Sequence, residues 1–103
     1  MEEKIRILIV DDHTVVRNAM HLMLDLKPNL EVVGEAQDGL EAIEQTRTLL
    51  PDVILMDLEM PRMGGIEAIA EIYREFPQVR IHSLLQPKDN GKSDEASSLH
   101  VMI

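Results

Sequence analysis

The chain has no cysteine and no tryptophan, and only one tyrosine and one phenylalanine occur among its 103 residues. Without cysteine it cannot form disulfides, cysteine-bound zinc sites or a thiolate nucleophile. Without an aromatic cluster it lacks the platform on which nucleic-acid bases stack. Basic residues are also few, with Lys+Arg 10 against Asp+Glu 19 and a net charge of −9. An acidic domain repels phosphate backbones, so we expect no nucleic acid to bind this chain alone.

Long apolar runs are missing as well. No stretch approaches the roughly 18 apolar residues that a membrane span needs. Residues 1–4, MEEK, lack the basic stretch and the apolar core of a signal peptide. These features predict a cytoplasmic protein with no membrane partner.

Short apolar runs alternate with helical patterns along a chain whose length suits one compact domain. Nearly continuous aliphatic runs at 5–10, 30–33, 53–56 and from 79 onward are typical of strands buried on both faces. The helices expected between these strands run over 14–26, from Asp38 to Pro51, and from Gly65 to Pro77. The alternation predicts an α/β fold, a doubly wound parallel sheet with right-handed crossovers.

The spacing of apolar residues also predicts which side of each helix faces the sheet. Asp38 and Glu41 have the spacing of a capping box at the start of the second helix. The side chains expected to face inward are Val16, Ala19, Met20, Met23 and Leu24 on the first helix, Leu40, Ile43 and Leu50 on the second, and Ile66, Ile69, Ile72, Tyr73 and Phe76 on the third.

Three carboxylates stand where apolar strands end. Asp11 and Asp12 follow the first strand, and Asp57 follows the third. If these strands are neighbours, their ends lie about 5 Å apart and the acids converge at the edge where parallel sheets bind ligands. Such a cluster favours Mg²⁺, and a carboxylate beside Mg²⁺ can attack phosphorus to give an aspartyl phosphate. A structural alternative is that Asp12 or Thr14 simply caps the following helix.

The segments ILIVDDHTVVR and PDVILMDLEMPRMGGIEA resemble the receiver domain of bacterial two-component response regulators. The resemblance covers residues 4–81 and is strongest to the subgroup with a C-terminal helix-turn-helix output domain. It implies a flavodoxin-like sheet of strand order 2-1-3-4-5. It also implies that Asp57 is the phosphoacceptor, that Asp12 binds Mg²⁺ directly and Asp11 through water, and that the backbone carbonyl of Glu59 is a further ligand. The metal set is thus Asp11, Asp12, Asp57 and Glu59, and the implied phosphodonor is a sensor histidine kinase.

The chain departs from the family pattern after residue 81. Receivers have Thr or Ser at the end of the fourth strand, where this chain has Leu85, and the family's lysine would fall just past residue 103. The polar, serine-bearing segment 82–103 has no recognisable counterpart of the family's last strand and last helices. We therefore predict a receiver core at 1–81 and an atypical, truncated or altered segment at 82–103, with no DNA-binding output domain.

An incomplete sheet has consequences for association. With a fifth strand missing, the fourth would be an open edge, and with helices missing, apolar parts of the sheet would be uncovered. We therefore expect self-association, such as a dimer with elements exchanged between chains.

Two interpretations of function follow. The first is a receiver that accepts a phosphoryl group on Asp57 and is not an enzyme in the sense of turnover. The second is a receiver remnant that no longer signals and acts as a self-associating or decoy module. A hydrolase that uses the three acids is a distant third, because no second base is evident.

Two histidines are expected to have no role in the chemistry. We expect His13 to be a rim residue beside the acids and His21 to be a solvated side chain.

Overall fold

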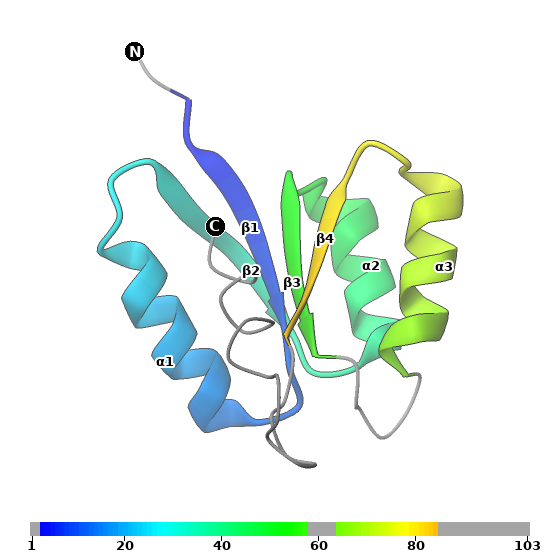
Figure 1. The fold of residues 1–103 in the computed structure, drawn as a ribbon, viewed down its shortest axis with the longest axis horizontal. Coiled ribbons are helices and arrows are strands. Elements are labelled where there is room, and N and C mark those ends of the chain that lie inside the picture. Colours follow the sequence, from blue (N-terminus) through cyan, green and yellow to red (C-terminus); the bar gives the residue numbers. More distant parts are fainter. Residues whose placement is uncertain (1–2, 58–63, 85–103) are drawn as a thin grey trace, which may run out of the picture.

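The computed structural model describes residues 3–57 and 64–84, which form one sheet flanked by helices (Figure 1). Strands and helices alternate along the chain in the predicted order. The elements are β1 (Ile5–Val10), α1 (Thr14–Asp25), β2 (Leu30–Ala36), α2 (Gly39–Leu49), β3 (Val53–Asp57), α3 (Gly65–Glu75) and β4 (Arg80–Leu84). No helix within these described ranges is long and apolar enough to cross a membrane.

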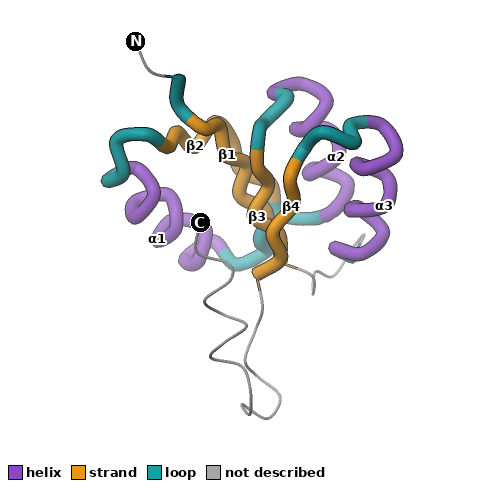
Figure 2. The backbone as a smooth tube through the Cα atoms, turned by 45° about the horizontal axis from the view of Figure 1, so that its top comes forward, coloured by secondary structure: helices purple, strands orange, loops and turns teal. Residues whose placement is uncertain are grey.

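The sheet is parallel throughout, with strand order β2-β1-β3-β4. Helix α1 lies on one face, and α2 and α3 lie on the other (Figures 1 and 2). This arrangement confirms the predicted doubly wound α/β fold, which is flavodoxin-like. Within the described residues β4 is an edge strand, and the predictions for 85–103 lie outside those residues.

The larger core lies between the sheet and the pair α2 and α3. Alternate residues of β1 and β3 point toward these helices, as the period of two in a strand requires. Small residues of the helices, such as Ala42 and Ala68, are fully buried and let the helices approach the sheet closely. The buried members of this core are Leu8, Val10, Ala36, Ala42, Ile43, Ile54, Met56, Ala68, Ile72 and Val79.

The opposite face is covered differently. Ile7, Ile9, Val53 and Leu55 form a second buried cluster, against which α1 packs through Met20 and Leu24. Helix α1 itself has no buried residue. The expectation that Val16, Ala19 and Met23 face inward is therefore wrong, and Val15, Leu22 and Leu26 are also exposed.

Strand β2 is longer than predicted, because it continues through Gly34 to Ala36. The pairing with β1 shifts between Ile7 and Leu8, so that Ile7 lies opposite Val32 and Leu8 opposite Gly34. A β-carbon at Gly34 would come within 2.5 Å of Leu49 Cδ1. A side chain at position 34 would therefore require the Leu49 side chain on α2 to shift, and Gly34 lies within the strand instead of ending it.

Helix α2 is fixed at both ends by hydrogen bonds. Asp38 is the N-cap and its Oδ1 accepts from the Glu41 N–H at 2.9 Å, while Glu41 Oε1 accepts from the Gln37 N–H at 3.0 Å. This confirms the predicted capping pair, with the return bond displaced by one residue. At the other end, Leu50 has a left-handed backbone (φ 51°), and its carbonyl accepts from Arg6 Nη1 at 2.8 Å.

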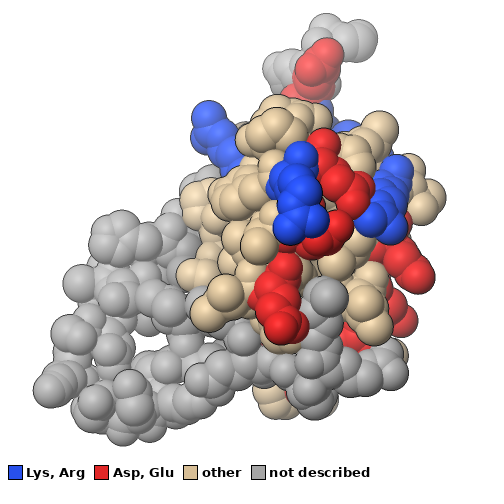
Figure 3. All heavy atoms as spheres, turned by 90° about the vertical axis from the view of Figure 1, so that its right-hand side faces the viewer, with Lys and Arg blue, Asp and Glu red and all other residues tan. Residues whose placement is uncertain are grey.

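The outer surfaces of α2 and α3 are polar and of mixed charge. Arg47 Nε donates to Glu75 Oε1 at 2.9 Å between the helices, and Arg74 Nη1 donates to Glu71 Oε1 at 2.7 Å. Basic and acidic side chains accordingly lie side by side on this face (Figure 3). The expectation that Leu40, Leu50, Ile66 and Tyr73 face inward is wrong, because these side chains are exposed.

We expect Asp38→Ala to lower the free energy of unfolding by about 1 kcal/mol, the usual effect of removing an N-cap. Asp38→Asn keeps an acceptor for the Glu41 N–H and should recover most of that loss. Urea denaturation followed by circular dichroism measures both variants. Equal stability of Asp38→Ala and wild type would show that the cap does not hold α2.

Candidate functional site

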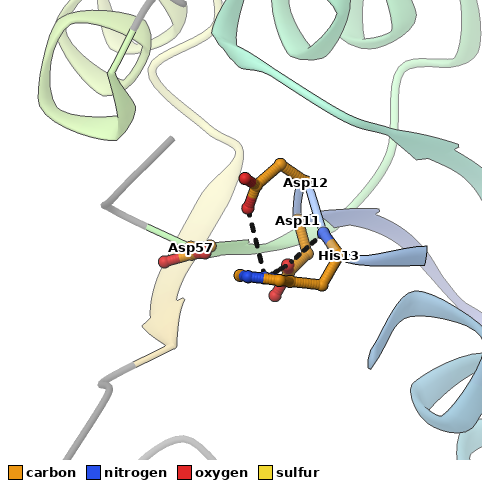
Figure 4. A group of neighbouring side chains, drawn as sticks. All are labelled: Asp11, Asp12, His13 and Asp57. Atoms are coloured by element: carbon orange, nitrogen blue, oxygen red, sulfur yellow. Dashed lines mark hydrogen bonds and ion pairs between the residues drawn. The ribbon is translucent and has the colours of Figure 1, made fainter. Parts of the chain in front are cut away.

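The acidic residues meet at the carboxyl ends of β1 and β3. Asp11 directly follows β1 as predicted, and Asp57 is the last residue of β3, because that strand ends one residue later than predicted. Val10 pairs with Met56, so the residues that follow them, Asp11 and Asp57, lie next to each other. Asp11, Asp12, His13 and Asp57 each offer an atom within 4.8 Å of the others (Figure 4). The predicted convergence of the three acids is therefore what the structure has.

Burial makes the close approach of these carboxylates electrostatically unfavourable. The Asp11 and Asp57 side chains are almost fully buried, and Asp12 is about a quarter exposed. Among the described residues, Asp11 Oδ2 and Asp12 Oδ1 are buried without a hydrogen-bond partner. Buried carboxylates repel one another and lose hydration, so a nearby cation stabilises the arrangement.

His13 lies where its ring, when protonated, would supply part of that positive charge. Its N–H and its Nδ1 both lie 2.8 Å from Asp11 Oδ1, and Nδ1 is 3.2 Å from Asp12 Oδ1. The hydrogen bond with Asp11, followed by the charge of Asp12, raises the pKa of His13. The ring is 62% exposed, so His13 lies at the rim as expected, but it binds the acids directly.

The capping alternative for these residues is wrong. The N-cap of α1 is His13, which makes no side-chain cap hydrogen bond. The Asp12 carboxylate instead faces the cluster, within 3.2 Å of His13 Nδ1 (Figure 4).

Comparison with known proteins agrees with this geometry. Residues 7–101 match the family described as response regulator receiver domain. The chain belongs to the response regulator receiver domain family. The match includes residues past 81, of which the structure describes only those up to Leu84, so the proposed boundary at 81 stays a prediction.

Proteins with different names match this chain over part of their length. The chain is 40% identical over 101 residues to the transcriptional regulatory protein DegU of Brevibacillus brevis, covering 98% of this chain and 41% of that protein. It is 46% identical over 74 residues to a protein-glutamate methylesterase/protein-glutamine glutaminase of Pyrococcus abyssi, covering 72% of this chain and 20% of that protein. This receiver therefore spans less than half of either relative.

A solved structure supports the fold directly. The response regulator domain of Thermotoga maritima CheB superposes with a TM-score of 0.79 at 38% identity, covering 96% of this chain and 73% of that chain. The shared fold places the acidic cluster at the strand ends, where receiver domains typically bind Mg²⁺.

The residues present fit such an ion. Mg²⁺ prefers carboxylate, carbonyl and water oxygens, and the cluster offers three carboxylates close together. The unsatisfied Asp11 Oδ2 is an acceptor that a cation or its water would satisfy. Glu59, the predicted carbonyl ligand, lies outside the described residues.

Sequence reasoning missed a polar network next to the site. Arg17 joins the Asp11 carbonyl to Glu35, and Glu35 also binds His21. The hydrogen bond from His21, and to a lesser degree that from Arg17, lowers the pKa of Glu35. His21 is thus bound to Glu35 and to Asp25, so its interpretation as a solvated side chain is wrong. Only the spacing of Arg17, His21 and Asp25 on one helical face could have signalled this network.

We expect Asp12→Asn to raise the free energy of unfolding in EDTA by about 1 kcal/mol, because one of several close negative charges disappears. In Mg²⁺ the wild type should gain stability and the variant should gain much less, because a ligand that binds only the folded state stabilises it. Urea denaturation above the titration range of His13 measures both effects. The control is Glu31→Gln, an exposed residue near the start of β2, and equal Mg²⁺ stabilisation of Asp12→Asn and wild type would contradict the metal site.

Proposed function

We propose that this receiver accepts a phosphoryl group on Asp57 from a sensor histidine kinase, in cytoplasmic two-component signal transduction. The observation that carries the proposal is the buried Asp57 carboxylate within 4.8 Å of ligand atoms from Asp11 and Asp12. Its position as the last residue of a fully buried strand directs it to the ligand edge of the sheet.

The transfer is a displacement at phosphorus. An Asp57 carboxylate oxygen forms a bond to the phosphorus of a phosphoimidazole, the P–N bond breaks, and its electron pair returns to the donor nitrogen. The product on this chain is an aspartyl phosphate. Mg²⁺, when bound, supplies the positive charge that offsets repulsion between the carboxylate and the phosphoryl oxygens. Asp11, Asp12 and Asp57 would hold the ion, with the Glu59 carbonyl as a further ligand.

The receiver itself is proposed to undergo modification and not to act as a turnover enzyme. The name methylesterase/glutaminase belongs to a relative of which this chain matches only 20%. The name transcriptional regulatory protein likewise belongs to a relative matched over 41% of its length. We propose that the chain by itself does not bind DNA, on the basis of its net charge of −9.

A second candidate function is a receiver that no longer signals. Leu84 pairs with Asp57 in the β3–β4 register, and the next residue in the sequence, 85, lies outside the described residues. That residue is a leucine, which has no hydroxyl to contact a phosphoryl group. This observation favours a chain that acts as a decoy for a kinase or as a self-associating module.

We expect incubation with Mg²⁺ and acetyl phosphate to add the mass of one phosphoryl group to the intact protein. Asp57→Asn should show no such adduct, because it lacks the nucleophile. Asp52→Asn, at the opposite end of β3, is the matched control and should be modified like the wild type. Intact mass spectrometry measures all three proteins.

The outcomes separate the two candidates. An adduct that persists in Asp57→Asn would overturn the assignment of the phosphoacceptor. No adduct on a folded wild type that binds Mg²⁺ would favour the receiver that no longer signals.

We also propose that the chain self-associates, as a dimer or with elements exchanged. In the described part of the sheet, β4 has a neighbour on one side only, which leaves backbone hydrogen-bonding groups along the other. Light scattering over a range of protein concentrations should show a rise in mean mass. A constant monomer mass at the highest concentration would contradict the proposal.

A further inference from the structure

We infer that Arg17 is a positioning residue for the acidic site, because it holds the main chain of the turn that carries Asp11 and Asp12. Arg17 is itself held by Glu35, which His21 binds from the other side. The inference rests on the proposed function in one respect, since Mg²⁺ binding at this site is one of its two readouts.

The key contact joins a side chain of α1 to the turn before the helix. Arg17 Nη1 donates to the Asp11 carbonyl oxygen at 2.7 Å. The Asp11 N–H donates to the Ala36 carbonyl at 3.0 Å. Both polar groups of the Asp11 main chain are therefore fixed, one by the end of β2 and one by Arg17, whose side chain is only 15% exposed.

The peptide plane carries this constraint to the next residue. The Asp11 carbonyl, the Asp12 N–H and both α-carbons lie in one plane, so fixing the carbonyl also fixes where the Asp12 side chain begins. The His13 N–H then bonds back to Asp11 Oδ1 at 2.8 Å and closes the turn. A metal site needs its ligands placed to within about 0.5 Å, so this turn is where a small rotation would matter most.

Arg17 is in turn fixed by a partner on another element. Its Nε donates to Glu35 Oε1 at 3.0 Å, and Glu35 Oε2 lies 2.7 Å from His21 Nδ1. Glu35 thus uses one oxygen for each of two residues on successive turns of α1. The guanidinium serves Glu35 from Nε and the Asp11 carbonyl from Nη1, two nitrogens held apart in one rigid plane, whereas a lysine side chain has a single donor nitrogen.

A merely structural role makes a different prediction. Arg17 also attaches α1 to β2, and α1 has no buried residue of its own. Loss of Arg17 could therefore loosen the helix without any specific effect on the turn. Met20 provides the matched control, because it attaches the same helix through apolar packing and makes no bond to Asp11.

The experiment compares Arg17→Met with Met20→Ala in the full chain. In EDTA, we expect the His13 amide to exchange its hydrogen faster in Arg17→Met than in the wild type, because the Asp11 carbonyl in the turn that this amide closes is no longer held. Calorimetric titration with Mg²⁺ alone should give a Kd raised by about tenfold in the same variant. Met20→Ala should lower the free energy of unfolding but leave both quantities near those of the wild type.

Each outcome decides the inference. Unchanged exchange and Kd in Arg17→Met, or equal changes in Met20→Ala, would overturn it. If Arg17→Met does not fold, Arg17→Lys keeps the charge but replaces the two separated donor nitrogens with one, and faster His13 exchange in that variant is the expected result. If the wild type binds no Mg²⁺, the metal part of the proposed function fails, and His13 exchange still tests the role of Arg17.

Discussion

Two carboxylates buried side by side, Asp11 and Asp57, set the terms for the rest of this molecule. Asp11 follows four buried apolar residues of β1, and Asp57 follows four buried apolar residues of β3, so the chain cannot turn these acids outward without breaking the sheet. The packing of β1 and β3 between helices on both faces keeps the two carboxylates close together although they repel each other. A fold that keeps acids together against repulsion has a strong affinity for positive charge at that point. When protonated, His13 provides some of that charge from within the chain.

The part of this arrangement that sequence predicts follows from local patterns. Apolar runs that stop at an aspartate place both the strands and the acids, and parallel pairing brings the strand ends together without further information. The errors come from tertiary context. Gly34 looks like a strand end but permits the close approach of Leu49. Leu40 and Leu50 fit an apolar helical face, yet the small residue Ala42 occupies the contact with the sheet and the two leucines are exposed.

The network around Glu35 could not be predicted for a related reason. Arg17 and His21 are ordinary surface residues by composition, and nothing local indicates that both point at one glutamate of β2. The partner of a charged side chain depends on how α1 lies across the sheet, and α1 contacts the sheet through Met20 and Leu24. Polar contacts between helices and strands are thus the features that the sequence predicts least well, although here they lie next to the site.

The helices are held to the sheet by different forces, and this difference divides the molecule's response to its surroundings. Helices α2 and α3 bury several residues each, while α1 buries none and depends on ion pairs with β2 beside a thin apolar contact. Dissolved salt screens charge pairs that are partly exposed, and it leaves apolar burial intact. The strength of the attachment of α1 to the sheet therefore varies with ionic strength. The attachment of α2 and α3, which is apolar, does not. Because the turn with Asp11 and Asp12 leads directly into α1, the acidic site is joined to the salt-sensitive side of the fold.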